Sequence, residues 1–277
     1  GGREGGRRGG DMIAFVATPI GNLKDITLRA LEELRAADVI FCEDTRHTVK
    51  LLSAYDIKKP LRACHKFNEH AAAEEIAALH GEGKRVCIVS DAGMPVVSDP
   101  GNTVCKDLRA AGVPYTVLPG ANAALSALVL SALDASRFTF VGFLPDKAGE
   151  RRRLLERFQN ARETLLFHSA PQDVDRDIAA MFEVFGERNA CAVREITKLY
   201  EEATPFPLSE GLAGEKRGEY VLVVEGASGE SPLNALSVRE HVKAYMDEGL
   251  TKKEALKKAA EDRGVAKSEL YRETLDL

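Results

Sequence analysis

The chain has 277 residues, 44% of them hydrophobic, which is enough for more than one domain with a buried core. A formal net charge of −5 excludes a surface that is basic all over, although it leaves room for local basic patches. No apolar run reaches the roughly 18 residues that a membrane-spanning helix needs, and the start, GGREGGRRGG, lacks the apolar segment of a signal peptide. We therefore expect a soluble, cytoplasmic protein.

The first half of the chain alternates apolar runs with amphipathic stretches. Residues 1–11 are rich in glycine and arginine without periodicity, which predicts a disordered arm or a cloning remnant. From Met12 the order MIAFVA, LRALEELRAA, VIFC and TVKLLSAY predicts strand, helix, strand and helix. A helix ending near Gly81, a strand at Val86–Val89 and a strand in VPYTVLPG continue the series. This alternation predicts an N-terminal α/β domain, residues 12–120, with a mainly parallel sheet covered by helices on both faces.

The second half starts with a predicted helix rich in alanine and leucine. Four strand-like runs follow, FTFVGFLP, ETLLFHSAP, ACAVREITK and EYVLVVEG, with helical stretches after the first two. They predict a second α/β domain over residues 121–226. The segment GASGESPLNA is typical of a linker, at 227–236, and residues 237–277 predict two or three short helices separated at Gly249 and Gly264.

The cysteines and histidines show no metal-binding pattern. The five cysteines are scattered without a CxxC pair, and the six histidines include no HExxH motif. We expect buried free thiols and no bound metal, and we expect His70 and His168 to be structural or surface residues.

Three turns come directly after predicted strands, at residues 17–23 (ATPIGNL), 42–46 (CEDTR) and 90–101 (SDAGMPVVSDPG). The carboxyl ends of parallel strands meet at one edge of a sheet, which is where ligands of such sheets bind. The turns should therefore gather there, with aspartates that can accept hydrogen bonds from a ligand or simply cap helices. These aspartates are Asp44, Asp91 and Asp99.

Several common nucleotide and hydrolase motifs are missing. GEGKR at 81–85 lacks the GxxxxGK[ST] spacing, no GxGxxG follows the first strand, and there is no GxSxG. The sequence therefore does not indicate a kinase-like enzyme, an NAD-binding enzyme or a serine hydrolase.

Long motifs follow one another in a characteristic order: ATPIGNLKDITLRAL, FCEDTRHTVKLL, IVSDAGMPVVSDPG, LPGANAAL, FVGFLP, VREITK and GEYVLVVEG. In this order they resemble the ribosomal RNA small-subunit methyltransferase I family of the tetrapyrrole methylases. The resemblance covers residues 12–226, and the tail is similar to the small C-terminal domain of that family. It implies an α/β, two-domain tetrapyrrole-methylase fold with a small helical C-terminal appendage.

The resemblance also implies an activity. Members transfer a methyl group from S-adenosylmethionine to the ribose 2′-hydroxyl of a cytidine in 16S rRNA of the small ribosomal subunit, and a homodimer is expected. Two alternatives stay open: a methyltransferase acting on a small tetrapyrrole-type molecule, and a non-catalytic ribosome-binding protein. The sequence departs from the family pattern most at residues 169–173, where SAPQD replaces ESPHR.

Site residues can be carried over one by one. Expected cofactor contacts, in a cleft between the two domains, are Pro19, Asp91, Ala92, Gly93, Met94, Asn122, Ala123, Ser169, Glu195, Ile196 and Thr197. Because a carboxylate can accept the proton of a hydroxyl, the expected catalytic residues are Glu43, Asp44 and Glu69. Expected RNA contacts are Arg46, His65, Asn68, Arg151, Arg152, Arg153 and Lys198, together with the tail lysines from Lys252 onward.

These assignments have structural alternatives. Asp44 or Thr45 could cap a helix while Arg46 pairs locally. The run of three arginines at 151–153 could be a solvated helix face.

Overall fold

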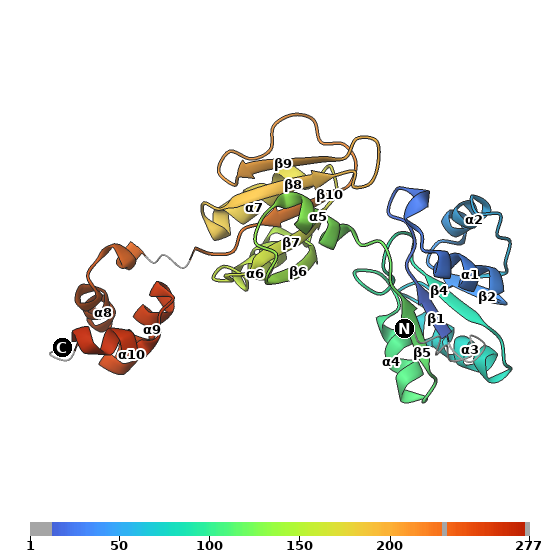
Figure 1. Cartoon of the computed structure of the whole chain (residues 1–277), viewed down its shortest axis with the longest axis horizontal. Coiled ribbons are helices and arrows are strands. Elements are labelled where there is room, and N and C mark those ends of the chain that lie inside the picture. Colours follow the sequence, from blue (N-terminus) through green and yellow to red (C-terminus); the bar gives the residue numbers. More distant parts are fainter. Residues whose placement is uncertain (1–12, 229–231, 275–277) are drawn as a thin grey trace, which may run out of the picture.

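The computed structural model describes residues 13–228 and 232–274, so the arm expected at 1–11 and part of the expected linker lie outside the described residues. The described chain forms two five-stranded sheets with their helices, followed by a group of helices that stands apart from the sheets (Figure 1). The α/β class and the helical C-terminal appendage predicted from the sequence are confirmed.

The first sheet is entirely parallel and has the strand order β3-β2-β4-β1-β5. Its central strands are short, fully buried apolar runs, as expected for a parallel sheet with both faces covered. The strands are β1 (Ile13–Val16), β2 (Val39–Cys42), β3 (Leu61–Ala63), β4 (Val86–Val89) and β5 (Tyr115–Leu118).

Helices cover both faces of this sheet, as predicted. On one face Leu34 and Leu52 pack with Ile40, and on the other Ile76 and Leu108 pack with Phe41. The first face belongs to α1 (Leu28–Ala36) and α2 (Thr45–Ser53), and the second to α3 (Glu69–Gly81) and α4 (Asn102–Ala110).

The second sheet is mixed, with the order β6-β7-β10-β8-β9. Strands β6 and β7 are parallel, whereas the other neighbours are antiparallel. The strands are β6 (Phe138–Phe143), β7 (Thr164–Ser169), β8 (Asn189–Arg194), β9 (Glu202–Pro207) and β10 (Tyr220–Val224). Helix α5 (Ala123–Ser131) packs on one face, and α6 (Ala148–Glu156) and α7 (Val174–Phe185) on the other.

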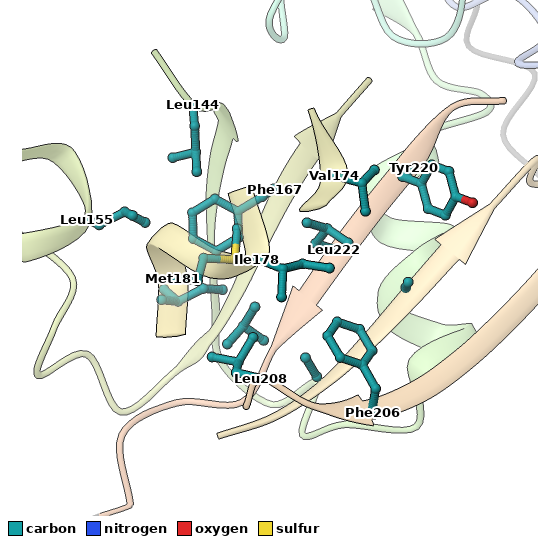
Figure 2. Close-up of a cluster of buried hydrophobic side chains, with 14 of the residues drawn as sticks. Leu144, Leu155, Phe167, Val174, Ile178, Met181, Phe206, Leu208, Tyr220 and Leu222 are labelled. Carbon is teal, nitrogen blue, oxygen red and sulfur yellow. The ribbon is translucent and has the colours of Figure 1, made fainter. Parts of the chain in front are cut away.

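The core beneath α7 holds this second sheet to its helices. Figure 2 shows Ile178 and Met181 of α7 pointing toward Phe167 of β7 and Leu222 of β10. Phe167 and Leu222 are completely buried because alternate residues of each strand face α7. This core supports the carboxyl end of β7 and the start of β10, which face the first sheet.

The C-terminal helices form a small core of their own. They are α8 (Val238–Asp247), α9 (Lys252–Arg263) and α10 (Lys267–Tyr271). Ser237 with Glu240 and Thr251 with Glu254 form capping boxes at the first two helix starts. Inside the bundle, buried His241 accepts a hydrogen bond from the Arg263 side chain.

Two further expectations can be compared with the fold. Cys42, Cys64, Cys87 and Cys191 are buried, Cys105 is half-buried, and all five are free thiols as predicted. Among residues 13–228 and 232–274, no helix combines the length and the apolar character that crossing a membrane requires.

Candidate active site

The three turns that follow β1, β2 and β4 lie together at the carboxyl edge of the first sheet, as predicted. Thr18 and Gly93 exchange two backbone hydrogen bonds, each of 3.0 Å. The backbone amide of Asp44 donates to Asp91 Oδ1 at 3.2 Å. Segments more than 40 residues apart in the chain are thereby joined into one surface.

Gly93 is required where these turns meet. Its φ of +77° lies in the region that side-chain-bearing residues rarely adopt. A Cβ added there would lie 3.1 Å from Ile20 Cγ2 and 3.4 Å from the Ala121 carbonyl oxygen. A side chain at this position would strain the backbone and press against both neighbours.

A cavity of about 770 Å³ opens between the two sheets, a size that suits a small-molecule ligand. Turns at the edge of the first sheet form one wall, and β6, β7, β10 and the loop after β8 form the other. Nine of the expected cofactor residues line it: Asp91, Ala92, Gly93, Met94, Asn122, Ala123, Ser169, Glu195 and Ile196.

The other two expected cofactor residues lie outside the lining. Pro19 sits between Thr18, which pairs with Gly93, and Ile20, which lines the cavity. The Thr197 hydroxyl donates a hydrogen bond to the Asp25 carboxylate, so it joins the second domain to the first.

The loop after β8 is strained. Glu195 and Thr197 have φ values of +49° and +67°, although neither is glycine. Residues in this strained conformation are often found at functional sites. The Glu195 carboxylate accepts hydrogen bonds from the Glu219 amide at 3.0 Å and from Lys198 Nζ at 3.1 Å. Lys198, which is expected to contact RNA near the cleft, lines the cavity, and its side chain lies over Gly21 of the first domain.

Ser169 has a structural partner. Its buried hydroxyl donates to Asp177 Oδ2 at 2.8 Å, and the Arg176 side chain binds Asp177 Oδ1 at 3.0 Å. The hydroxyl therefore anchors the end of β7 to α7, and the cavity wall depends on this anchor.

An aromatic wall of the cavity was missed by the sequence interpretation. Phe140 and Phe143 both contact the His168 ring, with centroid distances of 5.3 Å and 5.2 Å. A register shift between Phe140 and Gly142 lets Phe143 share a face with Phe138 and Phe140, which simple alternation would forbid. Burial lowers the pKa of His168, so its ring is neutral at neutral pH. The F-x-F start of β6 was the available signal.

Two of the three carboxylates expected to be catalytic are engaged in structural contacts. Asp44 caps α2 by accepting from the Arg46 amide at 2.9 Å, and it pairs with the Arg46 side chain at 2.9 Å. Hydrogen bonds from the side chain and amide of Arg46 hold the pKa of Asp44 at about 2. Glu69 accepts from the Thr103 amide at 2.8 Å and joins α3 to α4. Asp44 therefore caps α2 while Arg46 pairs with it locally, as the structural alternative for these residues predicts.

Glu43 is different, because burial raises the pKa of its carboxyl, and the negative charge of Asp91 acts in the same direction. It lies beside the cavity rather than in its lining. Within residues 13–228 and 232–274, no group of three His, Cys, Asp or Glu side chains is arranged to hold a metal ion.

The expected RNA contacts divide into two groups. Near the turns, the Arg46 side chain is 87% exposed, while Asn68 stabilises its own loop by accepting from the His65 amide at 2.8 Å. The His65 ring packs edge-on to Phe67.

The arginine run on α6 is not a free cationic patch. Arg151 is buried and donates to the carbonyl oxygens of Pro145 and Asp146, so its expected place at the surface is corrected to a structural one. Arg152 is bound by Glu156 and Glu183. Arg153 is exposed and donates to the carbonyl oxygen of Gly149 at 3.1 Å.

Comparisons with known proteins agree on one family. The family model described as tetrapyrrole (corrin/porphyrin) methylases matches residues 12–211. The ribosomal RNA small subunit methyltransferase I of Bacillus subtilis is 42% identical over 270 residues, covering 94% of this chain and 92% of the relative. The protein of the same name from Pseudomonas aeruginosa is 38% identical, covering 95% and 96%.

Solved structures show the same fold at low sequence identity. A diphthine synthase matches with a TM-score of 0.62 and 15% identity, covering 78% of this chain and 90% of that protein. The methyltransferase CobJ matches with a TM-score of 0.60 and 18% identity, covering 78% and 95%. The two-domain fold predicted from the sequence is confirmed.

Proposed function

This chain belongs to the tetrapyrrole methylases and, within them, to the ribosomal RNA small subunit methyltransferase I family, and on that premise we propose that it methylates the ribose 2′-hydroxyl of a cytidine in 16S rRNA. The observation that carries the proposal is the 42% identity to a relative of that name over 94% of the chain. The protein is an S-adenosylmethionine-dependent methyltransferase. The molecule that accepts the methyl group is the part of the proposal that requires a test.

The cavity between the sheets has the chemistry to hold this cofactor. Phe140 and Phe143 offer an apolar surface for a purine, and Asp91 and Glu195 offer carboxylates for hydroxyl or ammonium groups. The close backbone turn at Gly93 supports a ligand at short range. When bound, the cofactor supplies an activated methyl group, and the protein has to align the acceptor oxygen with it.

The rim beside the cavity suits an RNA acceptor. Phe67 is 84% exposed, and the Lys66 ammonium lies 4.9 Å above its ring centroid. Exposed aromatic rings stack on unpaired bases, and nearby cations bind phosphates. On the turn after β2, Arg46 adds a guanidinium that is 87% exposed although it also pairs with Asp44. These residues offer a local patch for RNA on an otherwise acidic chain.

The decisive test is transfer of a labelled methyl group from S-adenosylmethionine to 30S subunits purified from cells that lack this modification. We expect about one methyl group per subunit, located by the 2′-O-methyl block to alkaline cleavage. Fully modified 30S subunits are the matched control and should accept none. Labelling of a tetrapyrrole precursor in place of RNA would contradict the proposal, as would cofactor binding with no transfer to any acceptor.

We also propose that two copies associate through α5. This helix is apolar on all sides, a pattern typical of a buried helix, yet Val129 is 77% exposed, Leu125 47% and Leu130 40%. Exposed Leu199 and Tyr200 add apolar surface in the loop after β8. Exposed large apolar side chains gathered on one helix are typical of an interface.

Val129→Asp should therefore weaken self-association. A charge buried at an interface without a partner costs about 2 kcal/mol or more, which raises the dimer Kd by roughly 30-fold. Light scattering during gel filtration measures the mass. The matched control is Leu28→Asp on α1, because Leu28 is equally exposed at 79%. A wild-type monomer, or a Val129→Asp protein that dimerises as tightly as the control, would refute the α5 interface.

A further inference from the structure

One carboxylate of the cavity is without a partner. Asp99 lies in the SDPG segment, is half-buried and lines the cavity beside Ser98. Its amide donates to the Val96 carbonyl oxygen at 3.4 Å, but within the described part of the chain no hydrogen bond or ion pair reaches its carboxylate. This carboxylate is therefore free to accept a hydrogen bond or a proton from a ligand in the cavity.

The loop that carries Asp99 lies between the two domains. Val96 and Ser98 have φ values of +77° and +62°, which are unfavourable for residues with side chains and persist only when surrounding contacts impose them. Gly142 of β6 faces this loop so closely that a Cβ on it would lie 3.2 Å from Ser98 Oγ. The loop thus places Asp99 where the first domain meets the second.

The surroundings of Asp99 favour proton transfer. Burial raises the pKa of its carboxyl to about 6, and the nearby charges of Glu43 and Asp91 act in the same direction. Across the cavity, the second domain contributes His168, Glu195 and Lys198. A carboxylate with a raised pKa accepts a proton more readily than an ordinary aspartate.

The other acidic residues at this edge are less suitable. Asp44 and Glu69 accept hydrogen bonds from backbone amides, and Asp91 accepts one from the Asp44 amide. Glu43 has a raised pKa but lies outside the cavity lining. Only Asp99 among these five combines a position in the lining with an unpartnered carboxylate.

We propose that Asp99 is the general base of the methyl transfer. This inference rests on the proposed function. As the acceptor oxygen forms its bond to the methyl carbon, the bond from that carbon to sulfur breaks and its electron pair stays on the sulfur, which loses its positive charge. The hydroxyl proton passes to an Asp99 carboxylate oxygen and then to water. Atoms and charges balance without a further reactant.

Asp99→Asn tests this assignment, because the amide keeps the shape but cannot accept the proton. We expect the single-turnover rate of methyl transfer to 30S subunits to fall by about 10²- to 10⁴-fold, with the Kd for S-adenosylmethionine changed less than about threefold. The matched control is Asp56→Asn. Asp56 is exposed in a turn with φ of +57°, which asparagine adopts well, so this variant should behave as wild type.

The pH dependence provides a second readout. Asp99 must be ionised to accept a proton, so the wild-type rate should rise with pH through about 6 and then level off. The residual rate of Asp99→Asn should not show this rise with pH. This measurement on the wild type also decides the question if the variant does not fold.

Three outcomes would overturn the assignment. They are an Asp99→Asn rate within about threefold of wild type, an equal loss of rate and cofactor affinity that indicates a structural role, and a flat wild-type profile between about pH 5 and 8. If the wild type methylates 30S subunits and the variant does so equally well, only this inference fails. If the wild type transfers no methyl group to RNA, the proposed function fails with it.

Discussion

Gly93→Val is expected to weaken binding of S-adenosylmethionine by at least about 100-fold. Forcing a side chain into the left-handed region costs roughly 1–2 kcal/mol. At Gly93 the new side chain also meets Ile20 and the Ala121 carbonyl oxygen, at 3.1 Å and 3.4 Å from the position of Cβ. The turn must then move away from its hydrogen-bonded partner Thr18, and the cavity wall moves with it. Calorimetric titration with the cofactor measures the loss.

The chain offers a close control for this substitution. Gly83 has the same φ of +77°, but a Cβ there would meet nothing within 4 Å. Gly83→Val therefore carries the backbone strain without the crowding, and it should lose stability while keeping cofactor affinity. Equal affinity in the two variants would show that the Gly93 turn does not shape the cofactor site.

The second large effect is expected in stability. Asp177→Ala should lower the free energy of unfolding by about 2–3 kcal/mol, the usual cost of leaving a buried hydrogen-bond donor without its charged acceptor. Asp177 is 2% exposed, and its loss leaves the buried Ser169 hydroxyl without its acceptor. The Arg176 guanidinium loses one of its three carboxylate partners and keeps Asp146 and Asp173. Because Ser169 lines the cavity, weaker cofactor binding should accompany the lower stability. Urea denaturation measures the change.

Asp175→Ala is the matched control, two residues earlier on the same helix. Its carboxylate is 73% exposed and pairs with Lys216 at 3.0 Å. The Lys216 side chain is only 9% exposed, but its ammonium keeps its hydrogen bonds to the carbonyl oxygens of Leu212 and Gly214. Losing the pair with this exposed carboxylate should therefore cost about 1 kcal/mol. If Asp177→Ala were no more destabilising than Asp175→Ala, the buried contact with Ser169 would not anchor the end of β7.

The sequence alone predicted most of the first domain. Strands β1, β2 and β4 are short apolar runs followed by turns rich in glycine, proline and aspartate, and buried parallel strands require that pattern. It missed β3 and β9, whose residues are largely exposed and so carry little hydrophobic signal. Nine of the eleven residues that the resemblance assigned to the cofactor line the cavity. Six of them follow parallel strands of the first sheet, which end at one edge, whereas Ser169, Glu195 and Ile196 belong to the second sheet.

The roles of the polar residues were decided only by the tertiary structure. Whether a carboxylate caps a helix or faces a ligand depends on which amide lies within about 3 Å, and that amide can be far away in sequence. The Glu69 carboxylate accepts a hydrogen bond from the amide of Thr103, which lies 34 residues later, whereas the carboxylate of Asp99 faces the cavity. The aromatic wall likewise depends on a register shift in β6 that alternation cannot predict. The cavity is built from two domains, so its shape follows from how they pack rather than from either segment alone.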